Sequence, residues 1–217
     1  MAVKLSIHSK DIFKYPARYQ FGTVTPAPCG GRSCCTDTCI RMIVEYYKDL
    51  SPTLAEVRRA AQAKTNFNEA PCTGLNYIEV LNALKHYGIY HYRAKFGATH
   101  TDVWDRVQTG PVLVGVHYGS YPHWKGHCSI GTQAELGGKT DCNFTGAHAI
   151  LAIGRRYHTV DGQTHGDIFT RDPDHNGKSE KPAYDRITRA QIDVAMDNLP
   201  VKTAFQSTYI IYPTLHK

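Results

Sequence analysis

The sequence predicts an α+β fold in which helices form the N-terminal part and an antiparallel sheet follows. From about residue 30 to 88, apolar side chains recur every three or four positions, the spacing of amphipathic helices. From about 89 to 213, short aromatic and β-branched segments alternate with turn-forming residues, which is typical of strands. Because 217 residues with 41% hydrophobic side chains can bury one core, we expect a single domain over residues 1–217.

Three helices are expected in the first part. The first follows the cysteine pair at 34–35, and its buried face is formed by Cys39, Met42, Ile43, Tyr46 and Leu50. Ser51 and Pro52 have the pattern of an N-cap with proline in the first turn, so a second helix is expected to carry Leu54, Val57 and Ala61. A third is expected from about Asn76 to His86, with Ile78, Leu81 and Leu84 on its apolar face and Gly88 ending it.

The second part contains five candidate strands. In chain order they are IYHYRAKF, GPVLVGVHYG, GAHAILAIGRRY, GDIFTRDP and TAFQSTYIIYP, with a short helical piece around TDVWDRV. The pair Asp161-Gly162 predicts a turn between the third and fourth strands. The Gly- and His-rich stretch Ser120–Thr145 predicts a long loop of the kind that often carries function.

Composition and charge exclude several classes. The opening segment has no Sec-type signal pattern, and no segment reaches the roughly 18 apolar residues of a membrane span. The net charge of +6 and pI near 8.9 favour anionic surfaces, but Lys and Arg are scattered, so we do not expect a nucleic-acid partner. Seven cysteines cannot all pair within one chain, so at least one thiol is free or metal-bound.

Among the thiols, Cys35 is the candidate nucleophile. The N-terminal end of a helix stabilises a thiolate, and both Cys34 and Cys35 lie at such an end. Cys35 lies four residues before Cys39 and therefore lies over the buried face, whereas Cys34 is rotated from it by about 100°. Only Cys35 is expected to point toward whatever packs on this helix.

The expected sheet supplies a base and a carboxylate. His148 heads a strand that is apolar on both faces, and Asp172 ends the next strand before a proline. Cysteine, histidine and aspartate in this arrangement can act as nucleophile, base and orienting group. Asp174 shares the face of Asp172 on an extended segment, so either carboxylate could approach His148; we favour Asp172 because it lies within the strand.

The segment CTDTCIRMIVEYY, from Cys35 to Tyr47, resembles the nucleophile helix of papain-like peptidases of the C39-like group, which includes double-glycine leader peptidases and bacteriophage lysin domains. The segments TGPVLVGVHYG, GAHAILAIGRR and IFTRDPDHNG are similar to later strands of that family. The resemblance implies a papain-like fold over roughly residues 20–213, cleavage of peptide or amide bonds, and no cofactor. The resemblance also implies that Cys35 is the nucleophile, His148 the base and Asp172 the orienting carboxylate.

Two positions depart from the family pattern. The usual Cys-Gly-Pro is Cys35-Thr36-Asp37 here, and Cys29 stands where relatives carry a glutamine six residues before the nucleophile. Gln20 would reach the site only if the segment after it loops back. The backbone N–H of Cys35 is therefore the expected oxyanion donor.

The substrate expected from the basic charge and the His-rich loop is a peptidoglycan stem or cross-bridge peptide, with a general protein substrate second. A phage origin and assembly into a larger particle are further expectations, and the localisation stays open. One alternative is a structural zinc protein, for which the available ligands are Cys29, Cys34, Cys35, Cys39, Cys128, Cys142, His123 and His127. A disulfide using Cys128 or Cys142 is another. A third is a non-catalytic virion or cell-wall-binding component that keeps the fold.

Overall fold

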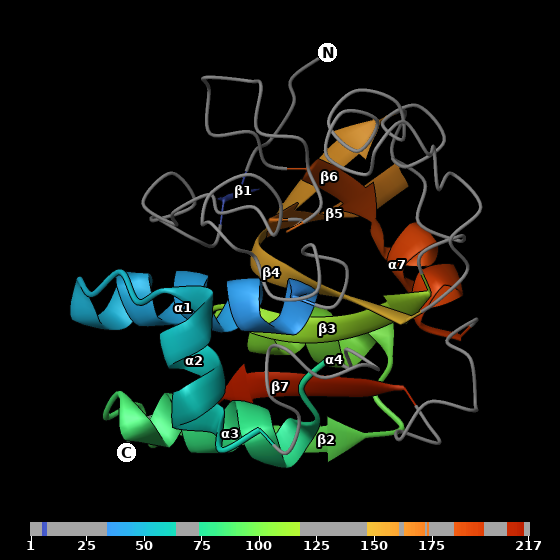
Figure 1. The fold of residues 1–217 in the computed structure, drawn as a ribbon. Coiled ribbons are helices and arrows are strands. Elements are labelled where there is room, and N and C mark those ends of the chain that lie inside the picture. Colours follow the sequence, from blue (N-terminus) through green and yellow to red (C-terminus); the bar gives the residue numbers. More distant parts are fainter. Residues whose placement is uncertain are drawn as a thin grey trace, which may run out of the picture.

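The computed structural model describes residues 6–7, 34–63, 74–117, 147–160, 163–171, 173, 185–197 and 208–214. Figure 1 shows an α+β arrangement of helices packed on a twisted sheet, as predicted. In chain order the elements are β1 (Ser6–Ile7), α1 (Cys35–Lys48), α2 (Leu54–Ala61), α3 (Tyr77–His86), β2 (Tyr92–Phe96), α4 (His100–Arg106), β3 (Val112–His117), β4 (Ala147–Val160), β5 (Gln163–Arg171), β6 (Asp185–Thr188), α7 (Arg189–Asp197) and β7 (Tyr209–Pro213).

The strands form one antiparallel sheet in the order β2-β7-β3-β4-β5-β6, with β1 also paired to β4. The helices α1, α2 and α3 lie on one side of the sheet, and α4 and α7 on the other (Figure 1). The sheet is therefore covered on both faces.

This covering explains why β4 is apolar on both faces. Its residues Ala149, Leu151 and Ile153 belong to the first core, under α1, α2 and α3. Its residues Ile150 and Ala152 belong to the second core, with side chains of α4 and α7. A strand buried on both sides gains nothing from polar alternation, so its sequence is a continuous apolar run, as predicted.

The first two helices differ from the prediction at their ends. The chain leaves α1 at Asp49, which adopts a left-handed conformation (φ 53°), so Leu50 lies outside the helix and is 50% exposed. The N-cap of α2 is Thr53 and not Ser51, because Thr53 and Glu56 form a reciprocal capping box. Thr53 N donates to Glu56 Oε2 at 2.7 Å, and Glu56 N donates to Thr53 Oγ1 at 3.2 Å.

The third helix lies where it was predicted. Asn76 is its N-cap, and Gly88 follows its last turn with a φ of +73°. Gly88 N donates to Lys85 O and Ile89 N donates to Leu84 O, both at 2.9 Å, the two bonds of a Schellman motif. Ile78 was expected on the buried face but is 54% exposed; Val80, Ala83 and Leu84 form that face.

All five predicted strands are present, as β2, β3, β4, β5 and β7, and the predicted short helix is α4. Val160 pairs with Gln163, so β4 and β5 are neighbours in the sheet, and the predicted Asp161-Gly162 turn between them lies outside the described residues. The elements β1, β6 and α7 were not predicted. The expected loop Ser120–Thr145 lies outside the described residues.

Candidate active site

Cys35 is the first residue of α1, and Cys34 is its N-cap residue. Thr38 donates to the Cys34 carbonyl from both its backbone N–H, at 2.9 Å, and its hydroxyl, at 2.8 Å. The helix then continues into the first core through Cys39, Met42 and Ile43, as the sequence predicted. Cys35 belongs to this core, whereas Cys34 is buried but is not one of its residues.

His148 is the second residue of β4, and its side chain forms a hydrogen bond with the Cys35 thiol. Only 5% of His148 and 9% of Cys35 are exposed. The structure thus brings together the two residues that sequence reasoning assigned as base and nucleophile.

The backbone N–H and the carbonyl of Ala149 each contact a thiol of α1. Its backbone N–H donates to Cys35, and its carbonyl accepts from Cys39 Sγ at 3.6 Å. Among the described residues, β5 pairs with β4 only from Leu151 onward, so Ala149 lies beyond the point where that pairing begins. The start of α1 is thereby attached to the edge of β4 next to His148.

The pKa values of the two neighbouring thiols, Cys34 and Cys35, are shifted in opposite directions. Burial acts against ionisation of Cys35, but the His148 hydrogen bond and charge, the Ala149 N–H and the Thr36 hydroxyl outweigh it and lower its pKa below the ordinary 9.0. Burial and the Asp37 carboxylate raise the pKa of Cys34 to about 12. Of the two thiols, Cys35 is therefore the one whose surroundings favour ionisation.

A buried tyrosine lies beside the thiols of Cys35 and Cys39. Tyr209, the first residue of β7, is in the first core together with Cys35 and Cys39. Burial raises its pKa, and the two nearby thiols raise it further, so its phenol stays neutral. A Cβ placed on Gly115 would lie 2.5 Å from Tyr209 Cε1, which shows that the ring packs directly on the β3 backbone.

An ion pair fixes the first turn of α1 to α2. Arg58 Nε donates to Asp37 Oδ1 at 3.0 Å and Arg58 Nη2 donates to Asp37 Oδ2 at 3.3 Å, with 3% and 0% of the two side chains exposed. Burial acts to lower the pKa of Arg58, but the Asp37 carboxylate outweighs it and raises that pKa. This pairing could not be predicted from the sequence, because nothing distinguishes Arg58 from the other scattered cations.

The two candidates for the orienting carboxylate follow the end of β5 in the sequence. The strand β5 ends at Arg171, which pairs with Leu151, three residues beyond His148 along β4. Asp172 and Asp174 lie outside the described residues, and the choice between them stays a prediction. Also outside are Gln20, Cys29, His123, His127, Cys128 and Cys142.

The structure describes three of the eight residues in the zinc hypothesis: Cys34, Cys35 and Cys39. Cys35 is a free thiol. Within the described ranges, no group of three or more His, Cys, Asp or Glu side chains could hold a metal ion. In those same ranges, no helix is long and apolar enough to cross a membrane.

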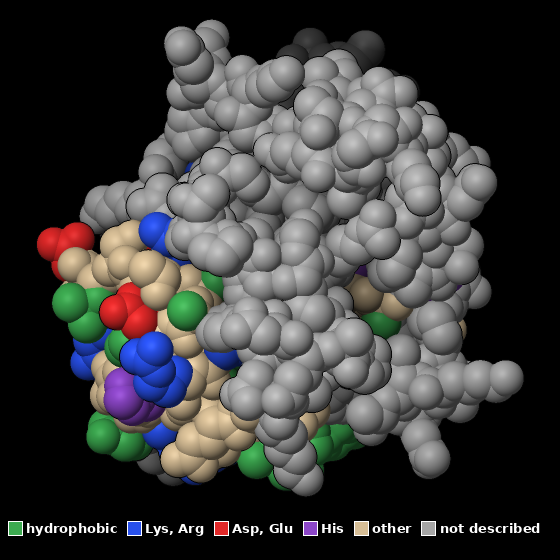
Figure 2. Space-filling view, viewed as in Figure 1, with side chains coloured by type: hydrophobic (Ala, Val, Ile, Leu, Met, Phe, Trp, Pro, Cys, Tyr) green, Lys and Arg blue, Asp and Glu red, His purple; other side chains and the backbone are tan. Residues whose placement is uncertain are grey.

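Charged side chains of both signs are mixed on the described part of one face of the molecule. On the face shown in Figure 2, the described basic, acidic and apolar side chains are interspersed over the helical part. This agrees with the scatter of Lys and Arg in the sequence.

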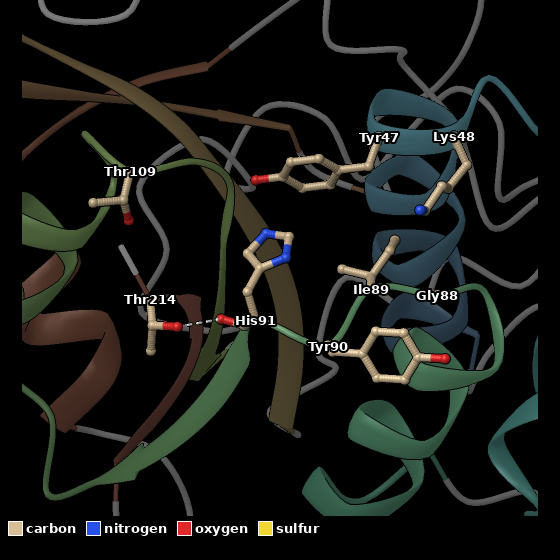
Figure 3. Close-up of a pocket in the computed structure, with 8 residues that line it drawn as sticks. All are labelled: Tyr47, Lys48, Gly88, Ile89, Tyr90, His91, Thr109 and Thr214. Atoms are coloured by element: carbon tan, nitrogen blue, oxygen red, sulfur yellow. Dashed lines mark hydrogen bonds between the residues drawn. The ribbon is translucent and has the colours of Figure 1, made fainter. Parts of the chain in front are cut away.

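A cavity of about 540 Å³ lies at the other end of α1 (Figure 3). It is lined by Tyr47 and Lys48 of that helix, by residues 88–91, and by Thr109 and Thr214. Residue 47 lies twelve positions after Cys35, roughly 18 Å along an α-helix. This cavity is therefore separate from the Cys35–His148 pair.

The described elements form an α+β fold with Cys35 at a helix start and His148 at a strand start. A Bacillus anthracis protein described as a C39-like peptidase has a similar structure, with 13% identity, a TM-score of 0.56, and 98% of this chain and 100% of that chain covered. The peptidase domain of Streptococcus ComA is 11% identical, with a TM-score of 0.43 and 92% and 99% covered. No family model and no curated protein matches the sequence. The fold is thus the C39-like, papain-like fold that the sequence predicted.

Proposed function

We propose that the protein is a cysteine peptidase or amidase in which Cys35 is the nucleophile, His148 the general base and acid, and Asp172 the orienting carboxylate. The observation that carries this proposal is the hydrogen bond between Cys35 and His148 at the start of α1, together with the lowered pKa of the Cys35 thiol. A reactive cysteine needs both a base within reach and a stabilised thiolate. The likeness of the fold to a C39-like peptidase supports the same reaction class.

The proposed residues can carry out both steps of the reaction, acylation of Cys35 and hydrolysis of the thioester. The Cys35 thiolate attacks the carbonyl carbon of the scissile bond, and the Cys35 backbone N–H stabilises the resulting oxyanion. Protonated His148 gives its proton to the leaving amine, and a thioester remains on Cys35. Neutral His148 then takes a proton from water, which attacks the thioester and releases the acid, and the Cys35–His148 ion pair is restored.

We further propose that the substrate is a peptide of bacterial peptidoglycan, in a stem or a cross-bridge. A net charge of +6 favours approach to anionic wall polymers. A general protein substrate is the alternative within the same reaction class. The phage origin and the association with a larger particle remain part of this proposal.

The test incubates the wild-type protein with purified cell walls and, separately, with a general protein substrate, and measures new amino termini. Wild-type protein and the Cys34→Ala variant should release new termini, and Cys35→Ala should release none. New termini only from the protein substrate would refute the peptidoglycan assignment. No cleavage of either substrate, with the protein sedimenting with the walls, would instead support the non-catalytic cell-wall-binding alternative.

A further inference from the structure

The first turn of α1 is anchored differently from the starts of α2, α3 and α4. The helices α2, α3 and α4 each begin with a capping box. The N-cap of α1 is Cys34, whose side chain forms no capping hydrogen bond. The side chain of Asp37, in that same turn, instead forms the two-point ion pair with Arg58 of α2.

We propose that the Asp37–Arg58 ion pair is a positioning device that fixes the rotation of the first turn of α1, so that Cys35 and not Cys34 is presented to His148. This inference rests on the proposed role of Cys35 and adds two positioning residues to it. It also gives a role to Asp37, the acidic residue in the first turn of α1.

The geometry of a helix start explains why rotation needs fixing. Successive residues of an α-helix are rotated by about 100°, so a partial turn of the first residues would exchange the two thiols. A planar guanidinium that binds both carboxylate oxygens fixes direction as well as distance. Since Asp37 lies only two residues after Cys35, this constraint acts on the turn that carries both thiols.

The charges of Asp37 and Arg58 affect the two thiols as well as the geometry of their ion pair does. An uncompensated carboxylate in the first turn would disfavour a thiolate beside it, and Arg58 offsets that charge. Burial and Asp37 raise the pKa of Cys34, whereas Arg58 lowers it. Removing only the Asp37 charge therefore leaves a cation that favours ionisation of Cys34.

A second ion pair offers a matched control. Arg156 Nη2 and Asp167 Oδ2 lie 2.8 Å apart, and 19% and 3% of the two side chains are exposed. This pair joins β4 to β5, with Arg156 eight residues from His148 along β4, roughly 26 Å on an extended strand. The Asp167→Asn substitution likewise removes the carboxylate from a guanidinium, here a partly buried one, but far from the two thiols.

The experiment measures where a limiting amount of iodoacetamide reacts at neutral pH in the full chain, with the Cys34 and Cys35 peptides quantified by mass spectrometry. The variants are Asp37→Asn, Arg58→Lys and the control Asp167→Asn, each compared at a temperature where thermal unfolding shows it to be folded. We expect the ratio of Cys34 to Cys35 labelling to rise about tenfold in Asp37→Asn, the equivalent of one pKa unit. Arg58→Lys should cause a smaller rise, because lysine keeps the charge but loses the two-point geometry.

Each outcome of the labelling experiment either supports or overturns the proposed positioning role. An unchanged ratio in the folded Asp37→Asn protein overturns the positioning role. If Asp37→Asn does not fold, Arg58→Lys decides in the same way. An equal rise in Asp167→Asn would assign the effect to general destabilisation, which also overturns it. Preferential labelling of Cys34 in the wild-type protein would refute the proposed nucleophile itself, and this result is separate from the others.

Discussion

Replacing Gly115 with alanine is expected to disturb the candidate site through Tyr209. The new Cβ would lie 2.5 Å from Tyr209 Cε1, 3.0 Å from Cζ and 3.1 Å from Cδ1. Gly115 does not have the positive φ of the left-handed region, so the backbone accepts alanine and the conflict is purely steric. Because the ring is buried beside Cys35 and Cys39, it cannot move without displacing the core around the nucleophile.

The size of the effect follows from overpacking. An added methyl group in a close-packed core typically costs about 1–3 kcal/mol, because side chains must leave their preferred rotamers. For a chain of 217 residues, each kcal/mol lowers the melting temperature by about 2–4 °C. Gly115→Ala should therefore melt about 2–12 °C below the wild-type protein, and its Cys35 should be alkylated more slowly at neutral pH.

A double-mutant cycle with Tyr209→Leu tests the reasoning, with melting temperature and Cys35 alkylation as readouts. Leucine removes the ring atoms that the new methyl group meets, so the two substitutions should compensate in part. Gly97→Ala is the control, since Gly97 has a φ of +62° and no neighbour within 4 Å of a new Cβ. Its cost comes from backbone strain and should not depend on Tyr209. Additive effects of Gly115→Ala and Tyr209→Leu would refute the steric explanation.

Three further predictions concern the thiols and the carboxylate. The alkylation rate of Cys35 should fall to half its high-pH plateau at a pH below 9.0, because a lowered pKa keeps the thiolate at lower pH; Cys34 should ionise only near pH 12, and the reverse order would contradict the assignment. Activity should survive a chelator and be abolished by a thiol alkylator, since a Cys–His pair makes its own nucleophile; the opposite pattern would favour zinc. Asp172→Asn should retain some activity while Cys35→Ala has none; a silent Asp172→Asn with a crippled Asp174→Asn, both folded, would transfer the orienting role to Asp174.

The fold class and most elements could be predicted because local signals agreed with tertiary packing. The apolar period of α1, the Gly88 stop after α3 and the double-sided apolar run of β4 all depend on residues near one another in the chain. The elements β1 and β6, with two and four residues, are too short to show a period. The N-cap of α2 was misplaced because Ser51-Pro52 and Thr53 offer competing signals, and the Thr53–Glu56 capping box decides between them.

The candidate site could be predicted as far as helix direction and strand position determine it. The distinction between Cys34 and Cys35 depends on rotation about one helix axis, which sequence spacing contains. The Ala149 amide, Tyr209 and Arg58 could not be found in this way, because each reaches the first turn of α1 through pairing or packing of distant segments.

The contacts of Ala149 connect the stability of the protein to its proposed chemistry. The thiols of Cys35 and Cys39, one turn apart on α1, contact the backbone N–H and the carbonyl of the same residue, Ala149, and His148 is the preceding residue. The bond from Cys39 holds α1 against β4, and the bond from Ala149 N–H stabilises the Cys35 thiolate. Any shift of α1 along β4 therefore changes both bonds and the distance from Cys35 to His148 together. Substitutions of buried core residues under α1, such as Leu113 and Leu151, should thus affect thiol reactivity as well as unfolding, although neither residue is part of the proposed machinery.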